Sequence, residues 1–123
     1  MINSYRELLV WQKAMTLVVL IYKLTDTFPK TEIYGLTSQM RRCSLSIPSN
    51  IAEGYNRNYQ KEFIQFLQIA YGSSAELETQ ISLAYEIGYI DKEKSEELLS
   101  LLTEVLKMLN TMLQKLRINP TRI

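Results

Sequence analysis

The sequence contains no histidine, only one cysteine and only two aspartates. Without histidine, the chain lacks the usual general base of enzymes and the usual zinc ligand. Cys43 has no histidine to activate it and lies on an apolar helical stripe, so we expect it to pack in the core. The two aspartates, Asp26 and Asp91, lie at expected helix ends, where capping explains them. These absences argue against an enzyme, a metal site and a bound cofactor.

Proline and glycine are also scarce, with three and four residues, which favours short links between long elements. The glycines are isolated, so no glycine-rich loop is available to cradle phosphate. A single cysteine excludes an internal disulfide and fits a reducing compartment. The first residues do not resemble a signal peptide, and the longest apolar run, from Leu17 to Tyr22, is too short to span a bilayer. We therefore expect a cytoplasmic protein without membrane contact.

Apolar residues recur at helical spacing along all 123 residues, a length that suits a single domain. The spacing predicts helices at about residues 6–28, 32–54, 59–88 and 92–117, followed by a frayed tail at 118–123. Thr31, Asn58 and Asp91 are expected to cap the last three helices, and Gly54 to end the second. Four helices with short links predict an all-α, antiparallel up-down-up-down four-helix bundle.

Pro48 lies inside the apolar stripe of the second expected helix. A proline in a helix interior costs roughly 3 kcal/mol, and a broken helix would normally reset the apolar spacing. The spacing of Met40, Cys43, Ile47 and Ile51 continues past Pro48 unchanged. We therefore predict one helix that is kinked at Pro48, not two helices.

Gly72 in the third expected helix is costly there, which suggests that another helix approaches it closely. The first and last expected helices carry more apolar surface than one four-helix core can bury. Exposed apolar surface marks interfaces, so we predict a homo-oligomer. One flanking row of the last helix repeats every seven residues, and one side of the second helix is mildly apolar. These two features supply the candidate interface residues Leu45, Pro48, Leu99, Leu106 and Leu113.

The net charge of +1 is unevenly distributed along the chain. Residues 1–61 carry eight Lys or Arg against four acids, and residues 62–123 carry six against nine. A basic half can bind phosphate or the acidic half of a second copy, although such asymmetry also occurs in proteins that do neither. In the segment around Tyr59, basic residues alternate with aromatic ones, a pattern that can bind single-stranded nucleic acid. The alternative is a polar turn whose tyrosine rings are partly buried. The candidate contacts with nucleic acid or a partner are Lys13, Arg41, Arg42, Arg57 and Lys61.

A row of polar residues recurs on the second expected helix beside its apolar stripe. The row consists of Gln39, Arg42, Ser46, Ser49 and Glu53, with Asn50 beside it. One interpretation is a recognition face. The alternatives are the solvent face of an amphipathic helix, or pairing of Arg42 and Glu53 with other helices of the bundle.

Five segments carry a resemblance to a known family: Leu9–Ala14, Phe28–Pro29 with Glu32, Tyr34–Gln39, Ser46–Gly54 and Ala70–Glu78. They resemble the bacterial four-helix bundle family, also called the 23S rRNA intervening-sequence protein family. The resemblance implies a homopentameric ring of four-helix bundles. Arg41 and Arg42 match basic positions of the family pattern, and a related retroelement accessory protein binds nucleic acid and a reverse transcriptase. The near-neutral charge of this chain departs from its basic relatives.

Together, these patterns predict a non-enzymatic, homo-oligomeric binding or adaptor protein that contacts RNA or DNA through a basic face. The alternative is a protein-interaction scaffold with no nucleic-acid role.

Overall fold

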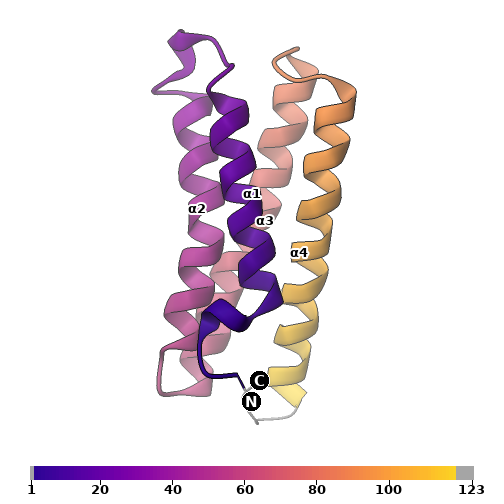
Figure 1. The fold of residues 1–123 in the computed structure, drawn as a ribbon. Helices are drawn as coiled ribbons and strands as arrows, with labels where there is room; N and C mark the ends of the chain where they lie inside the picture. Colours follow the sequence, from indigo (N-terminus) through magenta and orange to yellow (C-terminus); the bar gives the residue numbers. More distant parts are fainter. Residues whose placement is uncertain (1, 119–123) are drawn as a thin grey trace.

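The computed structural model describes residues 2–118, which form four long α-helices and two short 3₁₀ turns (Figure 1). The elements are, in order, η1 (Tyr5–Glu7), α1 (Leu9–Thr25), η2 (Lys30–Glu32), α2 (Leu36–Tyr55), α3 (Gln60–Glu86) and α4 (Lys92–Ile118). No strand occurs among these described residues. The expected tail lies outside them, apart from its first residue, which belongs to α4.

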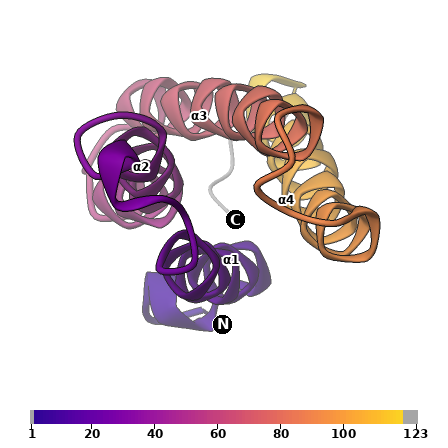
Figure 2. The same cartoon turned by 90° about the horizontal axis from the view of Figure 1, so that it is seen from above.

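The helices run alternately up and down, and they follow one another around the core when viewed along their axis (Figure 2). Each helix packs against the helix that follows it in sequence, and α1 also packs against α4. The predicted all-α, antiparallel four-helix bundle is therefore confirmed.

One apolar stripe of each helix faces the core, as the spacing predicts. The largest fully buried side chains include Leu17, Ile21, Ile47, Ile51, Phe63, Leu67, Leu102 and Leu109. Helix α2 passes through Pro48 as one continuous helix, so the prediction of a single helix is confirmed. Ile47 and Ile51 on either side of the proline are fully buried, and this burial offsets the lost backbone hydrogen bond. The kink itself stays a prediction.

Both ends of α1 lie inside the expected range of 6–28. The chain first forms η1, because Ser4 and Glu7 close a capping box around it: Ser4 Oγ accepts from the Arg6 N–H at 3.1 Å, and Glu7 Oε2 accepts from the Ser4 N–H at 3.0 Å. The helix proper starts two residues later and ends at Thr25, four residues before Pro29. Local capping therefore competes with the apolar pattern at this end of the chain.

The start of α2 differs most from the expectation, because η2 occupies the residues predicted to begin it. Thr31 lies within η2 and does not cap the helix. Instead, Glu32 Oε1 accepts the N–H of Leu36 at 3.1 Å, and Glu32 Oε2 accepts the hydroxyl of Tyr89 at 2.6 Å. The Tyr89 hydrogen bond, followed by the Leu36 N–H, lowers the pKa of the Glu32 carboxyl, and the same bond raises the pKa of Tyr89. One carboxylate thus stabilises the start of α2 and joins it to the link between α3 and α4.

Of the caps predicted for the last two helices, that of α4 is confirmed and that of α3 is wrong. Asp91 Oδ1 accepts the N–H of Lys94 at 2.8 Å, so the predicted cap of α4 is confirmed. For α3, Tyr59 rather than Asn58 occupies the cap position, and its side chain makes no capping hydrogen bond. The start of α3 is instead held by packing and by the contacts of its first turn described below.

The two helical glycines have roles opposite to those expected. Gly54 does not end α2, which continues to Tyr55. It is buried against α3, where an added Cβ would lie 2.7 Å from the Cβ of Phe66 and 3.1 Å from the Cδ1 of Phe63. Gly72 is exposed, and no atom lies within 4 Å of the position of an added Cβ. The prediction that another helix approaches Gly72 closely is therefore wrong for residues 2–118.

These glycines form a matched pair for a stability measurement. We expect Gly54→Ala to lower the free energy of unfolding by about 1–3 kcal/mol, because the new methyl group overpacks the contact with α3. We expect Gly72→Ala to raise it by about 0.5–1 kcal/mol, because alanine favours the helix and has room. Urea denaturation followed by circular dichroism measures both changes. Equal effects from the two substitutions would contradict the assigned packing.

Candidate functional site

The predicted polar row of α2 borders a shallow groove against α3. The groove has a volume of about 200 Å³ and is lined by Gln39, Arg42, Cys43, Ser46, Ser73 and Glu76. Ser46 and Ser73 share a hydrogen bond between their hydroxyls at 2.9 Å, and the Asn50 amide donates to the Ser46 carbonyl at 2.7 Å. Part of the row therefore joins two helices of the bundle. Gln39, Arg42, Ser49 and Glu53 remain at the surface.

Cys43 lies at the bottom of this groove and is not a nucleophile. Its thiol is buried and donates to the Ser73 carbonyl at 3.1 Å. Burial, assisted by the negative charge of Glu76, raises the pKa of the Cys43 thiol to about 12. A thiol with this pKa stays protonated at neutral pH, so the predicted packing role is confirmed.

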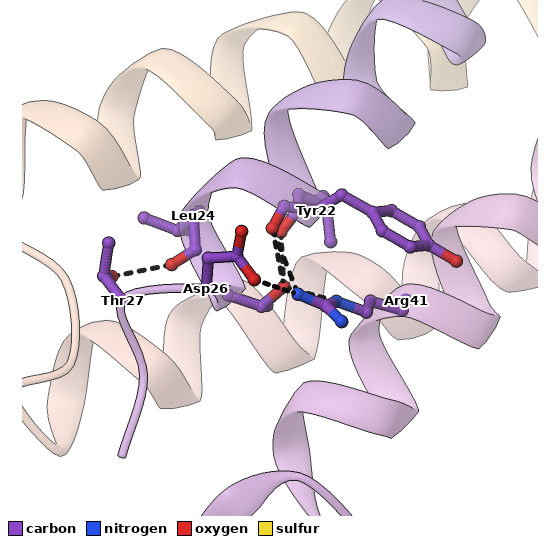
Figure 3. Close-up of polar contacts among 7 residues, drawn as sticks. Tyr22, Leu24, Asp26, Thr27 and Arg41 are labelled. Carbon is purple, nitrogen blue, oxygen red and sulfur yellow. Dashed lines mark hydrogen bonds and ion pairs between the residues drawn. The ribbon is translucent and has the colours of Figure 1, made fainter. Parts of the chain in front are cut away.

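Arg41 reaches from α2 to the end of α1 (Figure 3). Its Nε donates to Thr25 Oγ1 at 2.8 Å, and its Nη2 donates to Asp26 Oδ1 at 2.9 Å and to the Tyr22 carbonyl at 3.3 Å. The guanidinium carbon also lies 4.8 Å from the centroid of the Tyr22 ring. A cation is favourable here because the last carbonyls of a helix carry partial negative charge. Arg41 therefore stabilises the α1–α2 contact, and these contacts occupy the guanidinium.

Two more of the five candidate cations are also paired within the chain. Arg57 bridges Glu53 at 2.7 Å and Glu62 at 3.7 Å, and its guanidinium carbon lies 4.9 Å from the centroid of the Phe66 ring. Lys13 of α1 pairs with Glu104 of α4 at 3.4 Å. These contacts fix the α2–α3 turn and the α1–α4 seam.

The other two candidates, Arg42 and Lys61, are exposed and form no ion pair or hydrogen bond with the described residues. They do not form one site, because Arg42 borders the groove near the middle of α2, whereas Lys61 lies in the first turn of α3.

The side of α2 that carries Arg41, Leu45 and Pro48 faces α1, because Arg41 contacts Tyr22, Thr25 and Asp26. Pro48 is buried there, so the prediction that it contacts another subunit is wrong. The same correction applies to Leu113, which is only 3% exposed and belongs to the buried cluster of α4. Leu99 and Leu106 are partly buried against the core, and Leu45 is 45% exposed.

The structure reveals a charge pattern that the sequence halves do not show. The Lys13–Glu104 pair lies near the middle of the bundle, and the remaining charges of residues 2–118 divide between its two ends. At the end with the start of α1 lie six cations and three acids: Arg6, Arg57, Lys61, Lys107, Lys115, Arg117, Glu7, Glu53 and Glu62. Towards the opposite end lie six cations and nine acids: Lys23, Lys30, Arg41, Arg42, Lys92, Lys94, Asp26, Glu32, Glu76, Glu78, Glu86, Asp91, Glu93, Glu96 and Glu97.

Several cations at the basic end are free of ion pairs within residues 2–118. They are Arg6, Lys61, Lys107, Lys115 and Arg117. The Gln60 amide donates to the Leu116 carbonyl at 3.1 Å, which places the start of α3 beside the end of α4 and brings Lys61 near Lys115 and Arg117. Four of these five cations were not recognised in the sequence, although reading charges by their position along antiparallel helices would have found them.

Two general properties of the described residues bear on function. They contain no group of three or more His, Cys, Asp or Glu residues that is positioned to hold a metal ion. None of their helices combines the length and the hydropathy that crossing a bilayer requires.

The contacts of Arg41 predict a structural role that can be measured. We expect Arg41→Lys to lower the free energy of unfolding by roughly 1–2 kcal/mol, because lysine cannot make the forked hydrogen bonds and the stacking at once. Arg42→Lys is the matched control, and we expect it to change stability by less than about 0.5 kcal/mol, as is usual for an exposed residue. Urea denaturation measures both. Equal stability of the two variants would mean that Arg41 is free to bind a partner.

Comparison with known proteins supports the same fold. A family model described as 23S rRNA-intervening sequence protein matches residues 6–111. The chain is also similar to a crystal structure of a protein with unknown function from the S23 ribosomal protein family of Bacteroides thetaiotaomicron, with a TM-score of 0.80 and 26% identity. That match covers 85% of this chain and 98% of the other. No curated protein matches the chain. Because the family model covers most of its length, the chain belongs to the 23S rRNA-intervening sequence protein family.

Proposed function

We propose that this protein is a non-catalytic binding protein that assembles with copies of itself and contacts the phosphates of RNA through its basic end. The observation that carries the proposal is the group of unpaired cations at that end, Arg6, Lys61, Lys107, Lys115 and Arg117. Lysine and arginine side chains without an internal ion pair displace the counterions of the RNA when they neutralise its phosphates, and this release drives binding.

Aromatic side chains at the same end add a second kind of contact. Tyr59 is 69% exposed and lies two residues from Lys61. The Arg6 guanidinium carbon lies 5.6 Å and 5.4 Å from the ring centroids of Tyr5 and Trp11. The exposed ring of Tyr59 can stack on an unpaired base, whereas the rings of Tyr5 and Trp11 are partly buried and hold the Arg6 guanidinium in place. The family description, which refers to an intervening sequence of 23S rRNA, makes single-stranded RNA the first probe to use.

Self-assembly would multiply these contacts. Val19, Tyr22 and Leu45 stay substantially exposed on α1 and α2, and such apolar surface favours contact with another copy. Copies packed side by side with their helices parallel would present their basic ends on one face. Several weak phosphate contacts would then act together on one RNA strand. The family resemblance suggests five copies.

The RNA proposal predicts a steep dependence of affinity on salt. The probe is a fluorescein-labelled single-stranded 20-nucleotide RNA, followed by anisotropy at 50 and 200 mM salt. The slope of log K against log salt is negative, and each lost phosphate contact reduces its magnitude by about 0.7, so we expect Lys115→Gln/Arg117→Gln to reduce that magnitude by about 1.4. Lys23→Gln/Lys30→Gln removes the same charge from the opposite end and should leave the slope unchanged.

Two outcomes would count against RNA binding. Absence of binding at micromolar protein and 50 mM salt would remove it and leave the protein-scaffold alternative, which the exposure of Tyr34 (95%) at the other end favours. Equal losses in both double variants would show that only the net charge matters.

The assembly proposal is tested by light scattering coupled to gel filtration. We expect a mass near that of five chains for the native protein. Leu45→Glu should lower this mass while the circular dichroism spectrum stays helical, because a charge would be buried between copies. Gln39→Glu, an exposed change on a different side of α2, is the control and should leave the mass unchanged. A native protein that is already monomeric would contradict the proposal.

A further inference from the structure

We propose that the groove between the end of α3 and the start of α4 binds an arginine-containing basic segment of a partner protein. This proposal concerns the end opposite to the basic one and depends on neither RNA binding nor self-assembly. It is carried by the shape of the groove, the charges on its rim and the exposed apolar residues beside it.

The groove is an open hollow of about 230 Å³ on the outer side of the α3–α4 seam. Tyr85 of α3 and Leu99 of α4 supply most of its apolar lining, and Ser95 is buried at its base. Glu86 and Glu96 contribute one carboxylate from each helix. The groove thus offers an apolar surface between two negative charges.

The carboxylates on the rim are available to a partner. Glu86 forms no ion pair with any described residue. Glu96 pairs only with Lys92, at 3.9 Å, and both of these side chains are more than two-thirds exposed. Such exposed pairs contribute little free energy, so a better-placed cation can replace Lys92. The nine acids against six cations at this end of the bundle would attract a basic segment and repel nucleic acid.

Arginine fits this groove better than lysine does. Its methylene groups can lie along Leu99, and its guanidinium can make two parallel hydrogen bonds to a carboxylate. The same planar group can stack on the Tyr85 ring, which is 40% exposed. Leu83, in the last turn of α3, and Ile87, which directly follows the helix, are also exposed at this end of the bundle. A protein segment, with apolar residues beside its arginines, therefore fits better than a free cation.

The probe is a fluorescein-labelled hexa-arginine peptide, compared with hexa-lysine and hexa-glutamate peptides by anisotropy on the native full-length protein at low salt. We expect hexa-arginine to bind several-fold more tightly than hexa-lysine, and hexa-glutamate not to bind. Glu86→Gln/Glu96→Gln should weaken hexa-arginine binding by at least fivefold. Glu76→Gln/Glu97→Gln removes the same charge from the same two helices outside the groove, and it should change the affinity by less than twofold.

Two further variants test the individual contacts. Tyr85→Leu keeps the apolar lining but removes the ring, so it should abolish the preference for arginine over lysine. Lys92→Ala removes the competing cation and should tighten hexa-arginine binding. Equal weakening by both carboxylate double variants would show that only the net charge attracts the peptide, and unchanged binding in Glu86→Gln/Glu96→Gln would place the peptide elsewhere. Either result, or an arginine preference that survives Tyr85→Leu, would overturn the proposal.

Discussion

The close packing of α2 against α3 is the constraint on which the rest of the structure depends. Gly54 lets the two helices approach where Phe63 and Phe66 lie, and further along, Ser46 and Ser73 meet through their hydroxyls. Small residues at these points let the two backbones approach, so their larger apolar neighbours pack together in the core. This contact engages Cys43 and Ser46 of α2, while Gln39, Arg42 and Ser49 stay at the surface.

The internal contacts change where a function can be sought. The sequence makes Arg41 a binding candidate through the family pattern and Arg57 through its aromatic neighbours, yet both are held by acids and rings of the same chain. Their charges stabilise the links between helices and are not available to phosphate. Among residues 2–118, five of the eight cations without an ion pair lie at the basic end, and most carboxylates without one lie towards the other end. The unpaired positive and negative charges are therefore separated along the long axis of the bundle, and they do not form a stripe along one face of a helix.

Much of the fold could be predicted from the sequence because it follows from local periodicity. The core stripes, the continuity of α2 through Pro48 and the packing of Cys43 all depend on spacing within one helix. Helix ends were predicted less well, because Glu32 and Glu7 cap from positions where the apolar pattern is uninformative. The roles of Arg41, Gly54 and Gly72 depend on which residues of a neighbouring helix lie opposite, and one sequence does not contain that register. The distribution of charge between the two ends was missed for a different reason, because charges were counted by halves of the sequence and not by their position along antiparallel helices.

The hydrogen bond between Glu32 and Tyr89 has a consequence for how the bundle can come apart. Helices α1 and α2 form one hairpin, and α3 and α4 form the other, with the α2–α3 turn as their covalent junction at one end only (Figure 1). At the other end, the loops of the two hairpins are joined by the Glu32 carboxylate and by the rings of Phe28 and Tyr89, whose centroids lie 5.1 Å apart. The two hairpins would begin to separate at these contacts between their loops. A partner that binds both loops would therefore stabilise the closed bundle.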